Sequence, residues 1–475
     1  MTDVPGLIGL LQRADWTRLT LSGEVNDGSK VLVAPGMRYR YESAGYLTGC
    51  DGGRPWEIDG DEDDERQSVH WVSGPQAPLA RLLCPAWLLD GSRLEIRGST
   101  RVCGREALDV VMTRRPTLRT APVSADETAD VAKVLVDAES GILLRIPGLD
   151  EDDRPDVREF VRADFAPVID TSRFQPPPGS RIAEGIGDAF SGLPRPARLA
   201  ATTVGGLAAG ALGAWMRYAP SRHTAPSDAD GIDYGQKIPR DEPPPDRAQA
   251  ERPVTDDLLG LLHKGGPAEL QATLHQWLDI GAAAASVPGW ARRAGFGGLG
   301  LLMDAVGEKS RTSHMVSGIR FARPGVYQVD RRYQQRRHPT TIACDGQRCW
   351  QVYADKITNR SAQRPPADIG ALVDPSWLLR WTLSGGGALT FGGRSAYRIS
   401  AARRTGGAGS EPMLFPAAIA IVDAELGIIL RLTAYIGDNP VQRYELRDVT
   451  TSVGDFRPRI PDGLPVVEQS GRFPM

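Results

Sequence analysis

The stretch Val136-Asp-Ala-Glu-Ser-Gly-Ile-Leu-Leu-Arg145 returns almost unchanged as Val422-Asp-Ala-Glu-Leu-Gly-Ile-Ile-Leu-Arg431. The Asp-x-x-x-Gly spacing favours a hairpin turn, because glycine accepts a positive φ at little cost. The apolar residues on both sides of the turn predict strands. A repeat distance of roughly 290 residues is far longer than a solenoid unit, so the pattern indicates that a whole domain was duplicated.

Further motifs occur in the same order in both halves of the chain. The first half has Cys50-Asp-Gly-Gly-Arg-Pro-Trp56, and the second has Cys344-Asp-Gly-Gln-Arg-Cys-Trp350. A Pro-x-Trp-Leu-Leu segment follows each of them, at 85–89 and at 375–379. The Asp-Gly pairs favour hairpin corners, so each half is predicted to be an antiparallel meander with few helices.

Two alternating stretches are predicted to open the two domains. Leu19-Thr-Leu-Ser-Gly-Glu-Val25 is expected to match Met315-Val-Ser-Gly-Ile-Arg-Phe321, since both alternate apolar and other residues as a half-buried strand does. A Pro-Gly turn follows each stretch and precedes Tyr39 or Tyr327.

These patterns define the expected architecture. We expect a mainly β (α+β) protein with one domain over 1–180 and a second over 301–475, each a half-open antiparallel β-barrel. Between them, 181–218 is expected to be an apolar helical segment rich in Ala and Gly. The Pro-rich residues 219–254 are predicted to form a disordered linker, and 255–300 a helical segment.

The bulk composition narrows the function. A net charge of −3 and a pI near 6.1 argue against a general attraction to nucleic acid or anionic membranes. Residues 199–216 carry no charge, but their many Ala and Gly residues favour a packed helix over a membrane span. The N-terminus has no basic segment before an apolar run, so the chain as written is expected to be cytoplasmic, or exported if its true start lies upstream.

The five cysteines are too few for a disulfide scaffold. Cys344 and Cys349 flank a predicted turn, and the sequence leaves open whether they form a bridge or stay two buried thiols. Cys50 has no counterpart for such a bridge, because Pro55 stands at the matching position.

The shared order of a Pro-Gly turn, an Asp-Gly-x-x-x-Trp motif, an Asp-x-x-x-Gly hairpin and an alternating closing strand resembles the lipoprotein-carrier (LolA) family, whose relatives include the regulator RseB. The resemblance covers about three quarters of the chain. It implies a concave apolar sheet covered by helices that holds acyl chains or similar ligands without chemistry. It also implies that an Arg before the Pro-Gly turn helps to close the lid. Arg323 stands there in the second copy, where the first has Ala34.

The residues expected to contact a hydrophobic ligand share apolar or aromatic character and fall on these strands and motifs. They are Leu19, Leu21, Val25, Tyr39, Trp56, Trp87, Met315, Ile319, Phe321, Tyr327, Trp350 and Trp377. The tryptophans have a second interpretation, since a Trp kept in both copies is typical of a core. Besides Arg323, Arg145 and Arg431 are candidates for a lid or headgroup contact, although arginines are common at strand ends.

No cofactor or metal is predicted. The acidic residues 59–65 lack the Gly that a calcium loop needs, so we interpret them as a solvated loop. The six histidines are scattered, and no catalytic motif or phosphate-binding loop is present.

The leading hypothesis is therefore a non-enzymatic carrier or sensor that binds a lipid or an acylated molecule in two concave cavities. The alternative is a protein-interaction module of RseB type whose cavities are filled by its own side chains. An enzyme with an unmarked site is a distant third. Cavities lined by Leu21 or Phe321 would favour a carrier, and filled barrels would favour an interaction module.

Overall fold

The computed structural model describes residues 3–43, 46–52, 55–59, 68–71, 82–114, 131–149, 155–177, 181–182, 238–239, 253–279, 312–323, 325–332, 340–353, 356–360, 365–402, 416–458 and 463–467. The chain divides into two compact units. The described part of unit 1 ends at Ile182, and that of unit 2 begins at Ile238.

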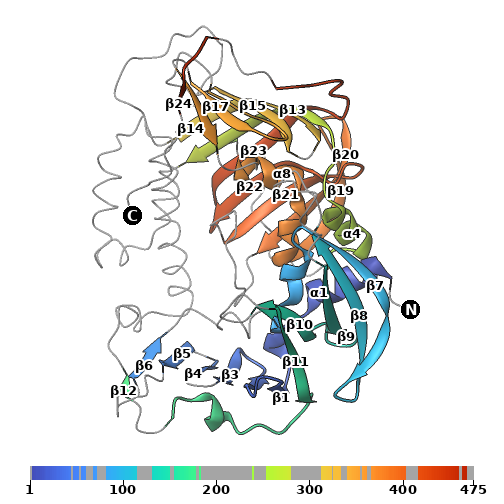
Figure 1. Cartoon of the computed structure of the whole chain (residues 1–475), viewed down its shortest axis with the longest axis vertical. Helices are drawn as coiled ribbons and strands as arrows, with labels where there is room; N and C mark the ends of the chain where they lie inside the picture. Colours follow the sequence, from blue (N-terminus) through green and yellow to red (C-terminus); the bar gives the residue numbers. More distant parts are fainter. Residues whose placement is uncertain are drawn as a thin grey trace. The chain divides into compact units, whose positions relative to one another are not determined.

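The elements of unit 1 run in Figure 1 from dark blue to green. They are α1 (Val4–Arg13), the 3-10 helix η1 (Trp16–Arg18), β1 (Leu21–Val25), β2 (Lys30–Ala34), β3 (Arg38–Ser43), β4 (Tyr46–Asp51), β5 (Pro55–Asp59), β6 (Ser68–Trp71), η2 (Pro85–Leu89), β7 (Ser92–Val102), β8 (Arg105–Arg114), β9 (Val131–Asp137), β10 (Leu143–Leu149), β11 (Pro155–Asp164), η3 (Thr171–Phe174) and β12 (Arg181–Ile182).

The elements of unit 2 run from yellow-green to red. They are α4 (Asp256–Lys264), β13 (Leu270–Asp279), β14 (Thr312–Arg323), β15 (Val326–Arg332), β16 (Thr340–Asp345), β17 (Cys349–Val352), β18 (Ile357–Arg360), α8 (Ala367–Val373), η8 (Pro375–Arg380), β19 (Thr382–Phe391), β20 (Arg394–Ala402), β21 (Ala417–Asp423), β22 (Ile429–Ile436), β23 (Asn439–Thr450) and β24 (Val466–Val467).

The two units have the same sheet topology. The strand order is β12-β6-β5-β4-β3-β2-β1-β11-β10-β9-β8-β7 in unit 1 and β24-β18-β17-β16-β15-β14-β13-β23-β22-β21-β20-β19 in unit 2. Neighbouring strands are antiparallel, except that the two-residue strands β12 and β24 pair in parallel with β6 and β18. The mainly β prediction is confirmed, and in the described residues neither sheet closes on itself.

The opening boundary of the second domain was predicted wrongly. Residues 255–300 were expected to be helical, but of the described part, 255–279, only α4 is a helix, and β13 follows it at the centre of the sheet. The sheet order makes β13 the counterpart of β1, so β14, which contains 315–321, corresponds to β2. The alternation of Leu270, Ala272 and Leu274 was the overlooked strand signal.

The other middle segments fall mostly outside the described residues. Of 181–218 the structure describes only β12, which belongs to the first sheet, and of 219–254 only 238–239 and 253–254. The candidate membrane segment 199–216 lies outside the described residues. Within the described ranges, no helix combines the length and apolar character needed to cross a bilayer.

The repeated Asp-Ala-Glu-x-Gly stretch is where the first described α-helix of each unit docks. Gly141 has a φ of 76°, and a Cβ there would lie 2.7 Å from the carbonyl oxygen of Leu10 in α1. Gly427 has a φ of 69°, and a Cβ there would lie 3.0 Å from the carbonyl oxygen of Leu261 in α4. Both glycines are therefore required by the turn and by the close approach of a helix.

Each sheet has two faces, and the pairing of the strands decides which residues lie on each face. We call the face that packs against helices the helix-covered face. Leu21, Val33, Tyr39 and Cys50 lie opposite one another across β1 to β4, and opposite residues share a face. Trp16 of η1 packs edge-on against Tyr39 there, with ring centroids 5.8 Å apart. Helical residues of unit 1 thus cover this face. In unit 2, Arg331 lies on the same face as Tyr327 and pairs with Asp368 of α8 at 2.9 Å, so a helix covers that face as well.

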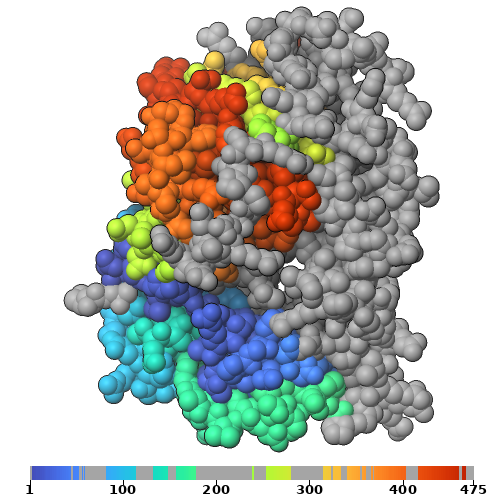
Figure 2. All heavy atoms as spheres, turned by 180° about the vertical axis from the view of Figure 1, so that it is seen from behind, coloured from blue at the N-terminus to red at the C-terminus, as the bar shows by residue number. Residues whose placement is uncertain are grey.

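The other face is crossed by the chain that leaves the sheet's central strand. We define residues 165–177, after β11, as crossing segment 1 and the described residues 451–458 and 463–465, after β23, as crossing segment 2. Figure 2 shows the green atoms after β11 against the blue atoms of the first strands. Phe174 of crossing segment 1 is fully buried against Leu32 and Ala34. In unit 2, Leu464 packs on the cluster that contains Trp350.

Candidate binding site

Most of the predicted strand residues lie buried on the helix-covered faces. In unit 1, Leu21, Val25 and Tyr39 have exposed fractions of 0, 2 and 1%. In unit 2, the values are 7% for Met315, 1% for Ile319, 0% for Phe321 and 1% for Tyr327. Neither of the two cavities described below has any of these side chains in its wall.

Two predicted positions lie at the margins of this group. Leu19 precedes β1 and is half-buried, so it is not part of the strand. The backbone of Arg323 ends β14 opposite Val326, as expected beside a Pro-Gly turn, but its side chain lies outside the described structure.

The tryptophans of the Asp-Gly motifs lie on the opposite face from Tyr39 and Tyr327. The register pairs Trp56 with Gly49 and Gly49 with Arg40, and it pairs Trp350 with Ala343 and Ala343 with Gln328. Trp56 and Tyr39, and likewise Trp350 and Tyr327, therefore cannot line the same face of the sheet. Tyr39 immediately precedes Arg40, and Tyr327 immediately precedes Gln328. Because adjacent residues of a strand point to opposite faces, each tyrosine lies on the face opposite to the tryptophan.

The indole N–H groups of the two tryptophans differ in their hydrogen bonding. The Trp56 Nε1 donates a 3.0 Å hydrogen bond to the carbonyl of Phe174 in crossing segment 1. The Trp350 Nε1 is buried and has no hydrogen-bond partner in the described structure. The tryptophans therefore lie in the cores beneath the crossing segments.

Trp87 and Trp377 lie in the 3-10 helices η2 and η8, and neither is on a strand. The Trp377 Nε1 donates to the carbonyl of Ala371 in α8 at 2.8 Å, and its ring packs edge-on against Trp381. Through its bond to Ala371, Trp377 fastens α8 to the following 3-10 helix. Trp87, the corresponding residue of unit 1, is half-buried.

Arg145 and Arg431 take part in cross-strand ion pairs. Arg431 Nη2 lies 2.8 Å from the carboxylate of Glu445, and its guanidinium lies 4.5 Å from the ring centroid of Phe391. Arg145 lies 3.7 Å from Glu159, which occupies the same register position on β11. These partners account for both arginines without a headgroup.

A second pair of arginines was not predicted, although its aspartates were in the repeated stretch. Arg105 donates to both carboxylate oxygens of the buried Asp137, at 2.6 and 2.9 Å, and in unit 2 the Nε of Arg394 donates to the buried Asp423. Burial alone would raise the pKa of each aspartate, but the arginine hydrogen bonds and turn amides outweigh it, so both pKa values are lowered. These aspartates order the hairpin turns.

Unit 2 contains a stacked ring cluster that the sequence did not suggest. Trp277 stacks on His314 with ring centroids 4.6 Å apart, and His275 Nδ1 lies 3.1 Å from His314 Nε2. Burial, Arg447 and His314 lower the pKa of His275 to about 4, so the imidazole is neutral at neutral pH. Within the described ranges, no three His, Cys, Asp or Glu side chains gather as a metal site would require.

Cys344 and Cys349 are joined by a disulfide across β16 and β17 on the helix-covered face of unit 2. Their Cα atoms are 4.1 Å apart. The alternative of two separate buried thiols is therefore wrong for this structure. Register explains the pairing, because the two residues lie directly opposite each other in the hairpin.

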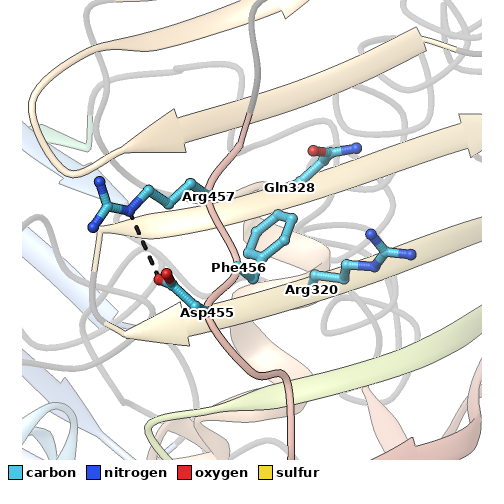
Figure 3. A pocket seen from close by; sticks show the side chains of 5 residues that line it. All are labelled: Arg320, Gln328, Asp455, Phe456 and Arg457. Carbon is cyan, nitrogen blue, oxygen red and sulfur yellow. Dashed lines mark ion pairs between the residues drawn. The ribbon is translucent and has the colours of Figure 1, made fainter.

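The larger described cavity opens on the face crossed by segment 2. It has a volume of about 670 Å³ and is lined by Arg320, Gln328, Asp455, Phe456 and Arg457. Figure 3 shows the Phe456 ring next to Gln328 and Arg320, with Arg457 on the other side of the ring. Arg457 and Asp455 form an exposed ion pair of 3.7 Å. The pocket is polar, with one aromatic ring.

Unit 1 has a smaller cavity at the same register position. It measures about 250 Å³, and its wall includes Leu32 and Arg40, which pair with each other as Arg320 and Gln328 do in unit 2. Arg40 donates to the carbonyl of Arg173 at 3.1 Å and to Glu42 at 2.6 Å. Crossing segment 1 is thus bonded directly to the sheet.

Comparison with known proteins finds similar chains among solved structures. No protein-family model matches it, and no curated protein matches it in sequence. It is similar to the MucB of the Pseudomonas aeruginosa MucA/MucB complex, with 16% identity and a TM-score of 0.23 over 38% of this chain and 62% of that one. The chain thus spans less than two thirds of the MucB chain that it matches.

Two further solved structures are similar over comparable shares of the chain. A DUF1329 family protein from Desulfovibrio piger is 10% identical, with a TM-score of 0.23 over 43% of this chain and 95% of that one. A putative outer membrane lipoprotein-sorting protein domain from Vibrio parahaemolyticus is 9% identical, with a TM-score of 0.18 over 39% of this chain and 86% of that one.

Proposed function

We propose that the chain is a non-catalytic binding module that engages a partner polypeptide on the faces crossed by its two segments. The observation that supports this proposal most directly is the burial of the predicted ligand residues. Leu21 and Phe321 are fully covered, whereas both described cavities open on the opposite face. A carrier needs an accessible apolar cavity on the face that these residues occupy.

We also infer that the two units arose by tandem duplication. The identical strand orders support this inference. So do the glycines that accept the first helix of each unit, at Gly141 and Gly427, and the equivalent pairs Arg105–Asp137 and Arg394–Asp423. After a duplication one copy can keep a structural role while the other changes its surface.

A hydrophobic ligand with a polar end is the second candidate, and one feature of unit 2 favours it. The Oε1 of Gln276 and the Oγ of Ser317 are buried on its helix-covered face and have no hydrogen-bond partner within the described structure. Ser29, at the register position of Ser317, instead bonds to Ser43 and Tyr41 at 3.2 Å each. Buried polar atoms without partners commonly mark a missing water or ligand.

Native mass spectrometry of the purified full chain separates the two candidates. We expect the mass of the protein alone, before and after addition of lipid vesicles. One or two equivalents of co-purified lipid would contradict the proposal and establish the carrier function.

Photo-crosslinking tests the face itself. Gly318 lies on the same face as Arg320, and a Cβ built there meets no atom within 4 Å, so a photoreactive side chain should fit. Gly98 of β7 is equally open and serves as the control. In an extract of the source cells, we expect a protein adduct from position 318 and none from position 98. Adducts from both positions in equal yield, or from neither, would argue against the proposed face.

A further inference from the structure

We infer that the cavity between crossing segment 2 and strands β14–β15 binds an acidic peptide segment, with Arg320 and Arg457 as the residues that recognise its carboxylates. This inference rests on the proposed function, because it names the chemistry of the partner on that face. The argument starts from the way in which the matching site of unit 1 is closed.

In unit 1 the crossing segment fills and clamps its site. Phe174 is fully buried beside Leu32, and two backbone carbonyls of the segment accept hydrogen bonds from Trp56 and Arg40. What remains is the cavity of about 250 Å³, in which Arg40 is already paired with Glu42. The arginine of this site is therefore used to hold the protein's own chain.

In unit 2 two of these positions carry different residues. Arg320 stands at the register position of Leu32, and Gln328 stands at that of Arg40. The Gln328 amide donates to Asp330 at 2.9 Å, and Asp330 also accepts from Thr341 at 2.6 Å. Within the described structure, Gln328 therefore bonds along the sheet, and the cavity is about 670 Å³.

The two arginine side chains of this cavity, Arg320 and Arg457, are accessible to a ligand. Arg320 is exposed, and its guanidinium lies 5.7 Å from the ring centroid of Phe456, at the limit of a cation–π contact. Arg457 and Asp455 are 85 and 91% exposed, so their 3.7 Å pair contributes little and exchanges readily for another partner. Asp330, the nearby acid on the same face, is already engaged by Gln328 and Thr341.

The spacing of the two guanidinium groups selects the ligand class. They lie on different sides of Phe456 and do not converge on one point (Figure 3). A single phosphate would need donors that converge on it, whereas an extended peptide presents carboxylates at intervals along its length. Gly318 and Gln271 leave exposed sheet beside Arg320, on which such a peptide can lie. The cavity wall itself holds two arginines and one aspartate, a formal charge of +1, in a chain of net charge −3.

The experiment is a calorimetric titration of the full chain with acetyl-hexaglutamate amide. We expect saturable binding that weakens about tenfold in R320Q and about threefold in R457Q, since each loses one charge-assisted contact. The matched control is R348Q, which removes an exposed arginine from the β16–β17 turn, outside the cavity wall, and should bind as the wild type does. Raising the salt concentration should weaken binding to the wild type and to R348Q alike.

Other outcomes would overturn the inference. Equal binding by R320Q and R348Q, or equal binding of a hexaglutamine peptide, would rule out carboxylate recognition at this site. Binding of inorganic phosphate without binding of the peptide would assign a small-anion site. A protein adduct at position 318 that R320Q and R457Q leave unchanged would keep the proposed function and reject only this chemistry. Co-purified lipid without any adduct would reject the proposed function itself.

Discussion

Crossing segments 1 and 2 start from equivalent strands and end in equivalent short strands, yet they meet their sheets differently: segment 1 buries Phe174, whereas segment 2 packs on the Trp350 cluster through Leu464. Phe174 is buried and its carbonyl accepts from Trp56, whereas Phe456 is half-buried and Trp350 has no such acceptor in the described structure. The same topology therefore supports a closed face in one unit and an open, charged cavity in the other. A few side chains on β14 and β15 make this difference.

The largest expected difference between the segments comes from their phenylalanines. Phe174→Ala should destabilise unit 1 by about 3 kcal/mol, because it empties a fully buried site. Phe456→Ala should cost less than about 1 kcal/mol, since that ring is only half-buried. Amide hydrogen exchange, analysed separately for β2–β5 and β14–β17, measures both. Equal losses of protection would mean that segment 2 is as firmly packed as segment 1.

The buried aspartates should behave alike in the two units. Asp137→Ala and Asp423→Ala should each cost about 2 kcal/mol, because each leaves a partly buried arginine without its carboxylate. Since the folded-state pKa of each aspartate is lowered, its ionised form stabilises the fold above the unfolded pKa. That contribution disappears as the pH falls through the folded pKa. Urea unfolding of both variants at pH 7 and at successively more acidic pH tests this, and costs that do not decline as the pH falls below the unfolded pKa would contradict it.

The tryptophans provide a finer comparison. Trp56→Phe should cost about 1 kcal/mol, because it deletes the indole donor and leaves the Phe174 carbonyl without it. Trp350→Phe removes a donor without a described partner, so its cost should be smaller. Urea unfolding of the two variants measures both losses of stability. A larger loss for Trp350→Phe would reveal an acceptor beneath crossing segment 2.

The smallest expected effect is the change that His314→Ala makes in the pKa of His275, within the His275–His314–Trp277 stack that only unit 2 has in the described structure. His275 should titrate with a pKa near 4 in an NMR pH series. Because the unfolded pKa is near 6.5, unfolding takes up a proton between these values, and stability declines as the pH falls from about 6.5 to 4. In His314→Ala the pKa of His275 should move toward its ordinary value. An unchanged titration would show that His314 has no influence on it.

The sequence predicted more of the fold than of the site. The repeated hairpin, the Asp-Gly corners and the Pro-Gly turns were visible because glycine and proline restrict φ and ψ locally. The entry of the second domain was missed because α4 and β13 together lie in a stretch that we interpreted as helical. The ligand residues could not be sorted, since a shift of one residue in register moves a side chain to the other face.

What the sequence by itself determined is the mainly β character, the internal repeat and the turns, all of which depend on local backbone preference and periodicity. Only the tertiary structure decided that Tyr39 and Trp56 lie on opposite faces, that Arg431 is paired with Glu445, and that a cavity opens beside Arg320. The physical reason is that pairing between strands and the path of the crossing segments depend on contacts between residues far apart in the chain, which no local pattern encodes.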